Sequence, residues 1–69
     1  MVKVIQETDA PSLRGVVLAL SDKLYRKKRA EKIAIRKCDG GQPLLCEYKT
    51  KTKTGRTTKR YLPLAVHKL

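Results

Sequence analysis

Three side chains in this sequence are of the types that bind transition metals: Cys38, Cys46 and His67. A structural zinc site normally needs four such ligands, and its cysteines usually come in closely spaced pairs. Here seven residues separate the two cysteines, and the chain contains no further cysteine or histidine. We therefore expect no metal site and no other cofactor, and we expect the two thiols to be small buried side chains on adjacent strands.

Side chains for catalysis are also few. One histidine and six scattered Asp and Glu residues could act as acids or bases. The sequence has no glycine-rich phosphate loop after a strand, and no nucleophile lies at a known spacing from a base. This pattern predicts a protein that is not an enzyme.

Basic side chains are abundant. Seventeen Lys and Arg residues stand against six acidic ones, giving a formal net charge of +11. Residues 1–22 have a net charge of −1, so the rest of the chain carries +12. Fourteen of the seventeen cations fall in two clusters: Lys23, Arg26, Lys27, Lys28, Arg29, Lys32, Arg36 and Lys37 in the first, and Lys49, Lys51, Lys53, Arg56, Lys59 and Arg60 in the second.

So much positive charge on a small body destabilises the compact state by self-repulsion, which a polyanionic partner would relieve. We predict a nucleic acid, DNA or RNA, as that partner, bound mainly through its phosphates. The predicted binding residues are the whole second cluster together with Arg26, Lys27, Lys28 and Arg29 from the first. Three alternatives stay open: a small adaptor or regulator that binds an acidic protein surface such as the transcription machinery, a basic helix that attaches to anionic membranes, and a solvated charged face that only keeps the protein soluble.

The length of 69 residues predicts one small basic domain over residues 1–69. Such a domain is marginally stable alone, so a partner or homo-oligomer formation would stabilise it. The longest apolar run, Val16 to Leu20, is far too short to cross a membrane. No secretory signal is visible at the N-terminus, and we expect a cytoplasmic, nuclear or nucleoid location.

The elements that position these cations follow from the spacing of the apolar residues. We expect an α+β fold, with a small antiparallel sheet of three to four strands and one amphipathic helix packed on one face. Apolar residues recur at helical spacing from Leu13 to Leu24, which predicts a helix over residues 12–29, capped by Asp9, with a basic outer side. Gly15 opposes one continuous helix, and a buried strand over Val16 to Leu20 is the alternative.

Strands are predicted where apolar and polar residues alternate. This pattern occurs near Val2 and Val4, at Ile33 and Ile35, from Leu44 to Lys53 and from Thr57 to Val66. A turn is expected at Asp39-Gly40-Gly41, and Pro63 suits a sheet edge. Tyr48 and Tyr61 are expected to pack within the fold rather than stack on bases.

The last two strands are expected to form a basic hairpin. A two-residue turn at Thr54-Gly55 would pair Lys53 with Arg56, Lys51 with Thr58, Lys49 with Arg60 and Tyr48 with Tyr61. One face would then carry Lys49, Lys51, Lys53, Arg56 and Arg60. Such a ribbon could lie in a duplex groove or along a single strand, with threonine hydroxyls adding hydrogen bonds, or it could be a hairpin whose lysines only prevent aggregation.

Overall fold

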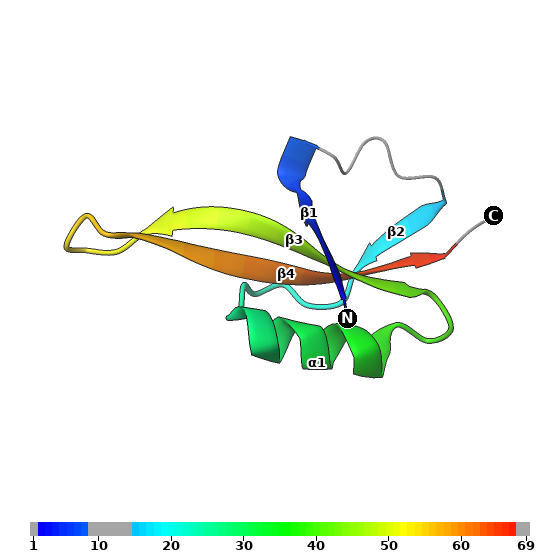
Figure 1. Cartoon of the computed structure of the whole chain (residues 1–69). Helices are drawn as coiled ribbons and strands as arrows, with labels where there is room; N and C mark the ends of the chain where they lie inside the picture. Colours follow the sequence, from blue (N-terminus) through cyan, green and yellow to red (C-terminus); the bar gives the residue numbers. More distant parts are fainter. Residues whose placement is uncertain (1, 9–14, 68–69) are drawn as a thin grey trace.

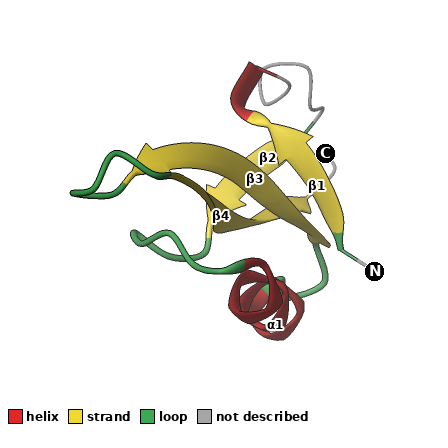
Figure 2. Cartoon of the chain, turned by 60° about the vertical axis from the view of Figure 1, so that its left-hand side comes forward, coloured by secondary structure: helices red, strands yellow, loops and turns green. Residues whose placement is uncertain are grey.

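The computed structural model describes residues 2–8 and 15–67, which form one helix and a four-stranded sheet. The elements in chain order are β1 (Lys3–Gln6), β2 (Val16–Ala19), α1 (Lys27–Lys37), β3 (Gln42–Lys51) and β4 (Thr57–His67). The strands lie in the order β1-β3-β4-β2, and α1 covers one face of the sheet (Figures 1 and 2). The predicted α+β fold is confirmed. Three strands are antiparallel as expected, and β1 runs parallel to β3, so the sheet is mixed.

The centre of the sheet is buried on both faces. Neighbouring residues of a strand point to opposite sides, so Leu44 and Leu45 enter different clusters. Leu45 packs with Val2, Ala30 and Ala34 under α1. On the other face, where β1 and β2 rise away from α1 (Figures 1 and 2), the second cluster consists of Ile5, Leu44, Cys46, Leu64 and Val66. Tyr48 and Leu62 pack at its margin.

The predicted helix over residues 12–29 is wrong over residues 15–26, only its last three residues belong to α1, and its expected start at Asp9 lies outside the described residues. Gly15 has a φ of 109°, and Val16–Ala19 then pairs with β4 as an antiparallel edge strand. The alternative prediction, a buried strand over Val16 to Leu20, was therefore right about the strand but wrong about its burial. Val16, Val17 and Leu18 are 43%, 36% and 47% exposed. A run of apolar residues this short does not by itself distinguish a strand from a helix.

The predicted strand at Ile33 and Ile35 is also wrong, because both residues belong to α1. The buried stripe of this helix consists of Ala30 and Ala34, which are fully inaccessible, whereas Ile35 is 60% exposed. Two alanines four residues apart lie one above the other on a helix, and their small side chains let the backbone approach the sheet closely. The most hydrophobic residues of the segment therefore did not mark its buried face.

The loop between α1 and β3 follows the prediction for Asp39-Gly40-Gly41. Asp39 and Gly40 have φ values of 46° and 82°, so two successive residues adopt the left-handed region. Gly41 leaves room for the side chain of His67: a Cβ atom there would lie 2.8 Å from His67 Nε2, so the imidazole would have to shift.

Pro63 lies inside the sheet, since β4 is a central strand, and the predicted edge position is wrong in that sense. Its carbonyl accepts a hydrogen bond from Leu20 N at 2.9 Å, directly after the last paired residue of β2. The nitrogen and carbonyl of a strand residue point to the same side, so the missing donor of Pro63 faces the point where β2 ends. The proline therefore breaks no hydrogen bond of the β3–β4 ladder.

Candidate nucleic-acid interface

The outer part of the β3–β4 hairpin, residues 48–60, extends beyond the rest of the fold, and we call it the arm (Figure 1). At the inner end of the arm, Tyr61 of β4 forms a bridge with Tyr25 in the segment before α1, with reciprocal backbone hydrogen bonds of 2.8 and 2.9 Å. The molecule measures 43 Å along its longest axis and 24 and 21 Å across the others. The arm accounts for this elongation.

The turn of the arm has three residues rather than two. Thr52 N donates to Arg56 O and Gly55 N donates to Thr52 O, both at 2.9 Å. Gly55 has a φ of 81°, as expected for the glycine of a three-residue hairpin loop with a bulge. The predicted two-residue turn at Thr54-Gly55 is therefore wrong.

This longer turn shifts the pairing of the two strands by one residue. Lys49 lies opposite Lys59, Tyr48 opposite Arg60 and Glu47 opposite Tyr61. Because side chains alternate along a strand, a shift of one residue moves every side chain of one strand to the other face. The predicted common face for Lys49, Lys51, Lys53, Arg56 and Arg60 is therefore wrong as well.

The cations of the arm occupy both faces and the tip. Leu45 packs under α1, so alternation along β3 places Lys49 and Lys51, together with Lys59 opposite, on the face that α1 covers further inward. Arg60 lies on the other face with Thr50 and Thr58. Arg56 continues the Arg60 side by the same alternation, and Lys53 lies in the turn.

None of these charges is neutralised within the described part of the chain: no Lys or Arg of the arm forms an ion pair there. Arg60 Nη1 donates instead to the backbone oxygen of Lys59 at 3.0 Å. Lys49 and Lys59 face each other directly, an arrangement that destabilises a β-ladder. The arm thus concentrates positive charge at a cost in stability.

The threonines of the arm bond to one another. Thr50 and Thr58 hydroxyls are 3.0 Å apart and also contact the opposite strand's carbonyls, and the hydroxyls of Thr52 and Thr54 are 2.9 Å apart. These hydroxyls stabilise the hairpin, so the arm is held by its own side chains beyond the core.

The second set of predicted residues lies at the start of α1. Arg26 is the N-cap residue, and Lys27, Lys28 and Arg29 form the first turn, with all four exposed. Arg29 is held over the ring of Tyr25 at 5.8 Å, and the Tyr25 hydroxyl lies 2.9 Å from that of Ser21. The first turn holds no acidic residue, and cations there oppose the helix dipole. The structure therefore places these residues on the same side of the sheet as Lys49, Lys51 and Lys59, with Arg56 and Arg60 on the other side and Lys53 in the turn.

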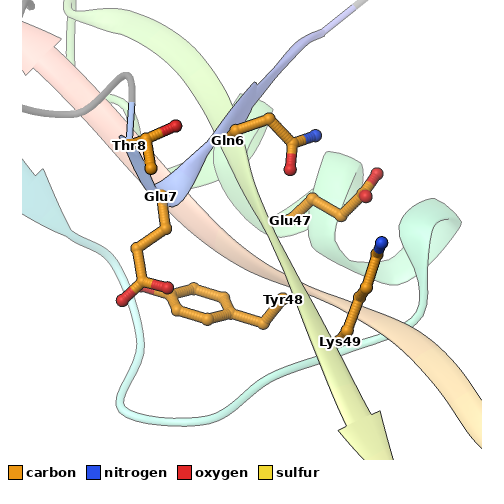
Figure 3. Close-up of a pocket in the computed structure, with 6 residues that line it drawn as sticks. All are labelled: Gln6, Glu7, Thr8, Glu47, Tyr48 and Lys49. Atoms are coloured by element: carbon orange, nitrogen blue, oxygen red, sulfur yellow. The ribbon is translucent and has the colours of Figure 1, made fainter.

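A shallow hollow at the base of the arm is lined by Gln6, Glu7, Thr8, Glu47, Tyr48 and Lys49 (Figure 3). The carboxylate of Glu7 lies beside the ring of Tyr48, whereas Glu47 points away from that ring. The pKa of Tyr48 is raised above its ordinary value, first by a hydrogen bond with Cys46 and then by burial. The two carboxylates do not converge on a shared point, and they mark the inner limit of the basic surface.

The three side chains that could have bound a metal lie in different places. Cys46 is buried in the cluster opposite α1, and Cys38 caps α1 with its thiol donating to Ile35 O at 3.3 Å. His67 packs against Gly41. Among residues 2–8 and 15–67, no group of three potential ligands comes together. The same part of the chain contains no helix with the length and apolar character needed to cross a membrane.

Comparison with protein-family models, with curated proteins and with solved structures finds no match to this chain. Sequence reasoning found the basic residues but not their division between two faces. The sequence feature that could have indicated this division was Gly55, because a glycine there fits a three-residue loop, with its different register, as well as a two-residue turn.

Proposed function

We propose that this protein binds nucleic acid without catalysing a reaction, mainly through phosphate contacts from the arm and from Arg26, Lys27, Lys28 and Arg29. The observation that carries the proposal is the composition of the arm in its projecting position. Residues 48–60 contain six cations and no acidic residue, and they extend beyond the core (Figure 1). Lys49, Lys51, Lys53, Arg56 and Lys59 are exposed, and Arg60 is half-buried.

The cost of this arrangement supports a binding role. A hairpin that needs lysine only to prevent aggregation gains nothing from placing Lys49 opposite Lys59, since such a pair weakens the ladder. The cations in the first turn of α1 likewise oppose the helix dipole. A bound polyanion would neutralise these cations and so remove both the repulsion across the ladder and the unfavourable interaction with the helix dipole. Phosphates attract Lys and Arg without regard to base sequence.

A titration at two salt concentrations tests the proposal. Duplex DNA, single-stranded DNA, duplex RNA and an acidic protein should each be titrated with the full chain. If six to eight phosphates are contacted, a rise from about 50 to about 200 mM salt should weaken binding to duplex DNA by roughly a thousandfold or more. Weak binding to every nucleic acid, with tight and salt-insensitive binding to the acidic protein, would favour the adaptor alternative.

A further inference from the structure

The placement of cations on both faces of the arm restricts the shape of its ligand. Lys49, Lys51 and Lys59 lie on the α1 side and Arg60 lies on the other, where alternation along the chain also places Arg56. An extended single strand or a flat anionic surface can meet one of these faces at a time. A groove has phosphates along both walls and can meet both faces together.

The thickness of the arm selects between the two grooves of B-DNA. Sheets that pack face to face lie about 10 Å apart, so a ribbon with side chains on both faces is about that thick. The major groove is about 12 Å wide and about 8.5 Å deep, and it admits a two-stranded ribbon, whereas the minor groove is about 6 Å wide. The stretch from Tyr48 to Thr52 alone spans about 14 Å of extended chain, which is enough to reach the floor of the major groove.

The side chains of the arm also argue against RNA and single strands. The major groove of an A-form RNA duplex is too narrow for side chains to read. Binding of single strands relies on aromatic platforms, and residues 49–60 contain no aromatic side chain. Tyr48 and Tyr61, at the base of the arm, pack against the two core clusters.

We propose that the ligand is duplex DNA and that the arm enters its major groove, an inference that rests on the proposed function. Lys49, Lys51 and Lys59 approach the phosphates of one wall, and Arg56 and Arg60 approach those of the other. The cations at the start of α1 contact the backbone beside the groove on the lysine side. Because the hydroxyls of Thr50 and Thr58 bond to each other, this face of the arm has little capacity to read bases, and binding depends weakly on sequence.

The test uses the full chain and ligands that differ in one groove. Four ligands are compared at one salt concentration: a B-form DNA duplex, an A-form RNA duplex, the same DNA duplex with glucosylated 5-hydroxymethylcytosine in the major groove, and an A·T-rich DNA duplex with netropsin in the minor groove. We expect RNA and glucosylated DNA to bind about tenfold or more weaker than plain DNA, equivalent to at least one lost phosphate contact at about 0.1 M salt. Netropsin should change the affinity by less than about twofold, since it leaves the major groove open.

Two double variants test whether the arm is the part of the protein that enters the groove. In Lys53→Ala with Arg56→Ala, the penalty from glucosylation should shrink, because fewer groups enter the groove. In Lys27→Ala with Lys28→Ala, that penalty should persist at a lower overall affinity. Circular dichroism must show that both variants are folded.

Each outcome separates this inference from the proposed function. Equal affinity for all four ligands would overturn the groove assignment and leave nucleic-acid binding intact, as would displacement of the protein by netropsin. Absence of binding to every nucleic acid at low salt would overturn the proposed function itself.

Discussion

The inner and outer halves of the β3–β4 hairpin are continuous in backbone and opposite in character. In the inner half, both faces are buried, with Leu44 and Leu64 on one side and Leu45 under α1 on the other. In the arm, both faces are open and carry cations. One pair of strands therefore supplies the stability of the fold at one end and an extended charged surface at the other. The difference indicates that binding and folding can be altered separately along the same ribbon.

The largest effect is expected from the inner half. Leu45→Ala removes a fully buried side chain between the sheet and α1 and should cost about 2 to 5 kcal/mol of unfolding free energy, enough to unfold a marginal domain. Chemical denaturation followed by circular dichroism measures this. The matched control is Leu24→Ala, since Leu24 is 39% exposed and its truncation should cost clearly less. Equal losses for the two variants would contradict the division between core and surface.

In the arm, binding should change without unfolding. Lys51→Ala with Lys53→Ala removes two exposed cations and should lower the salt slope for duplex DNA by about two units. Affinity at about 0.1 M salt should fall by roughly ten- to a hundredfold. Fluorescence anisotropy at several salt concentrations measures both quantities, and an unchanged slope would exclude these lysines from the interface.

A smaller loss is expected at the start of α1. Lys27→Ala with Lys28→Ala removes the same charge as the arm variant, but these residues lie on a helix from which the charges spread around the axis. We expect affinity to fall less than in the arm variant, while the helix gains from the removal of cations near its positive end. The opposite order of the two affinities would relocate the binding surface to α1.

The smallest effect is a gain in stability. Lys59→Thr removes the like-charge pair with Lys49 and should stabilise the free protein by about 0.2 to 1 kcal/mol, while it weakens DNA binding. Thermal unfolding with and without DNA measures the two changes. Lys23→Thr, at an exposed position outside the arm, is the control for loss of charge alone. A loss of stability in Lys59→Thr would show that the lysine supports the hairpin instead.

How well the sequence predicted the fold depended on how distinctive each pattern was. The long alternation in β3 and β4 was predicted correctly, because ten residues of period two have no helical alternative. The helix was predicted too early in the chain, because the apolar residues from Leu13 to Leu24 have helical spacing. The buried stripe of the actual helix consists of Ala30 and Ala34. The cations of the proposed interface were identifiable from composition. Their faces were not, because the loop length that sets the register was ambiguous at Gly55.

The colloidal behaviour of this protein in concentrated salt should be governed by the edge strand β2. Val16, Val17 and Leu18 are exposed there, and residues 15–21 contain no charged side chain. In dilute salt the net charge of +11 keeps molecules apart, but at about 1 M salt the Debye length falls to about 3 Å and this repulsion is lost. An uncharged strand at the edge of a sheet is then an open template for backbone pairing between molecules. Salt high enough to release this protein from the proposed polyanion is therefore also the condition in which it is most prone to precipitate.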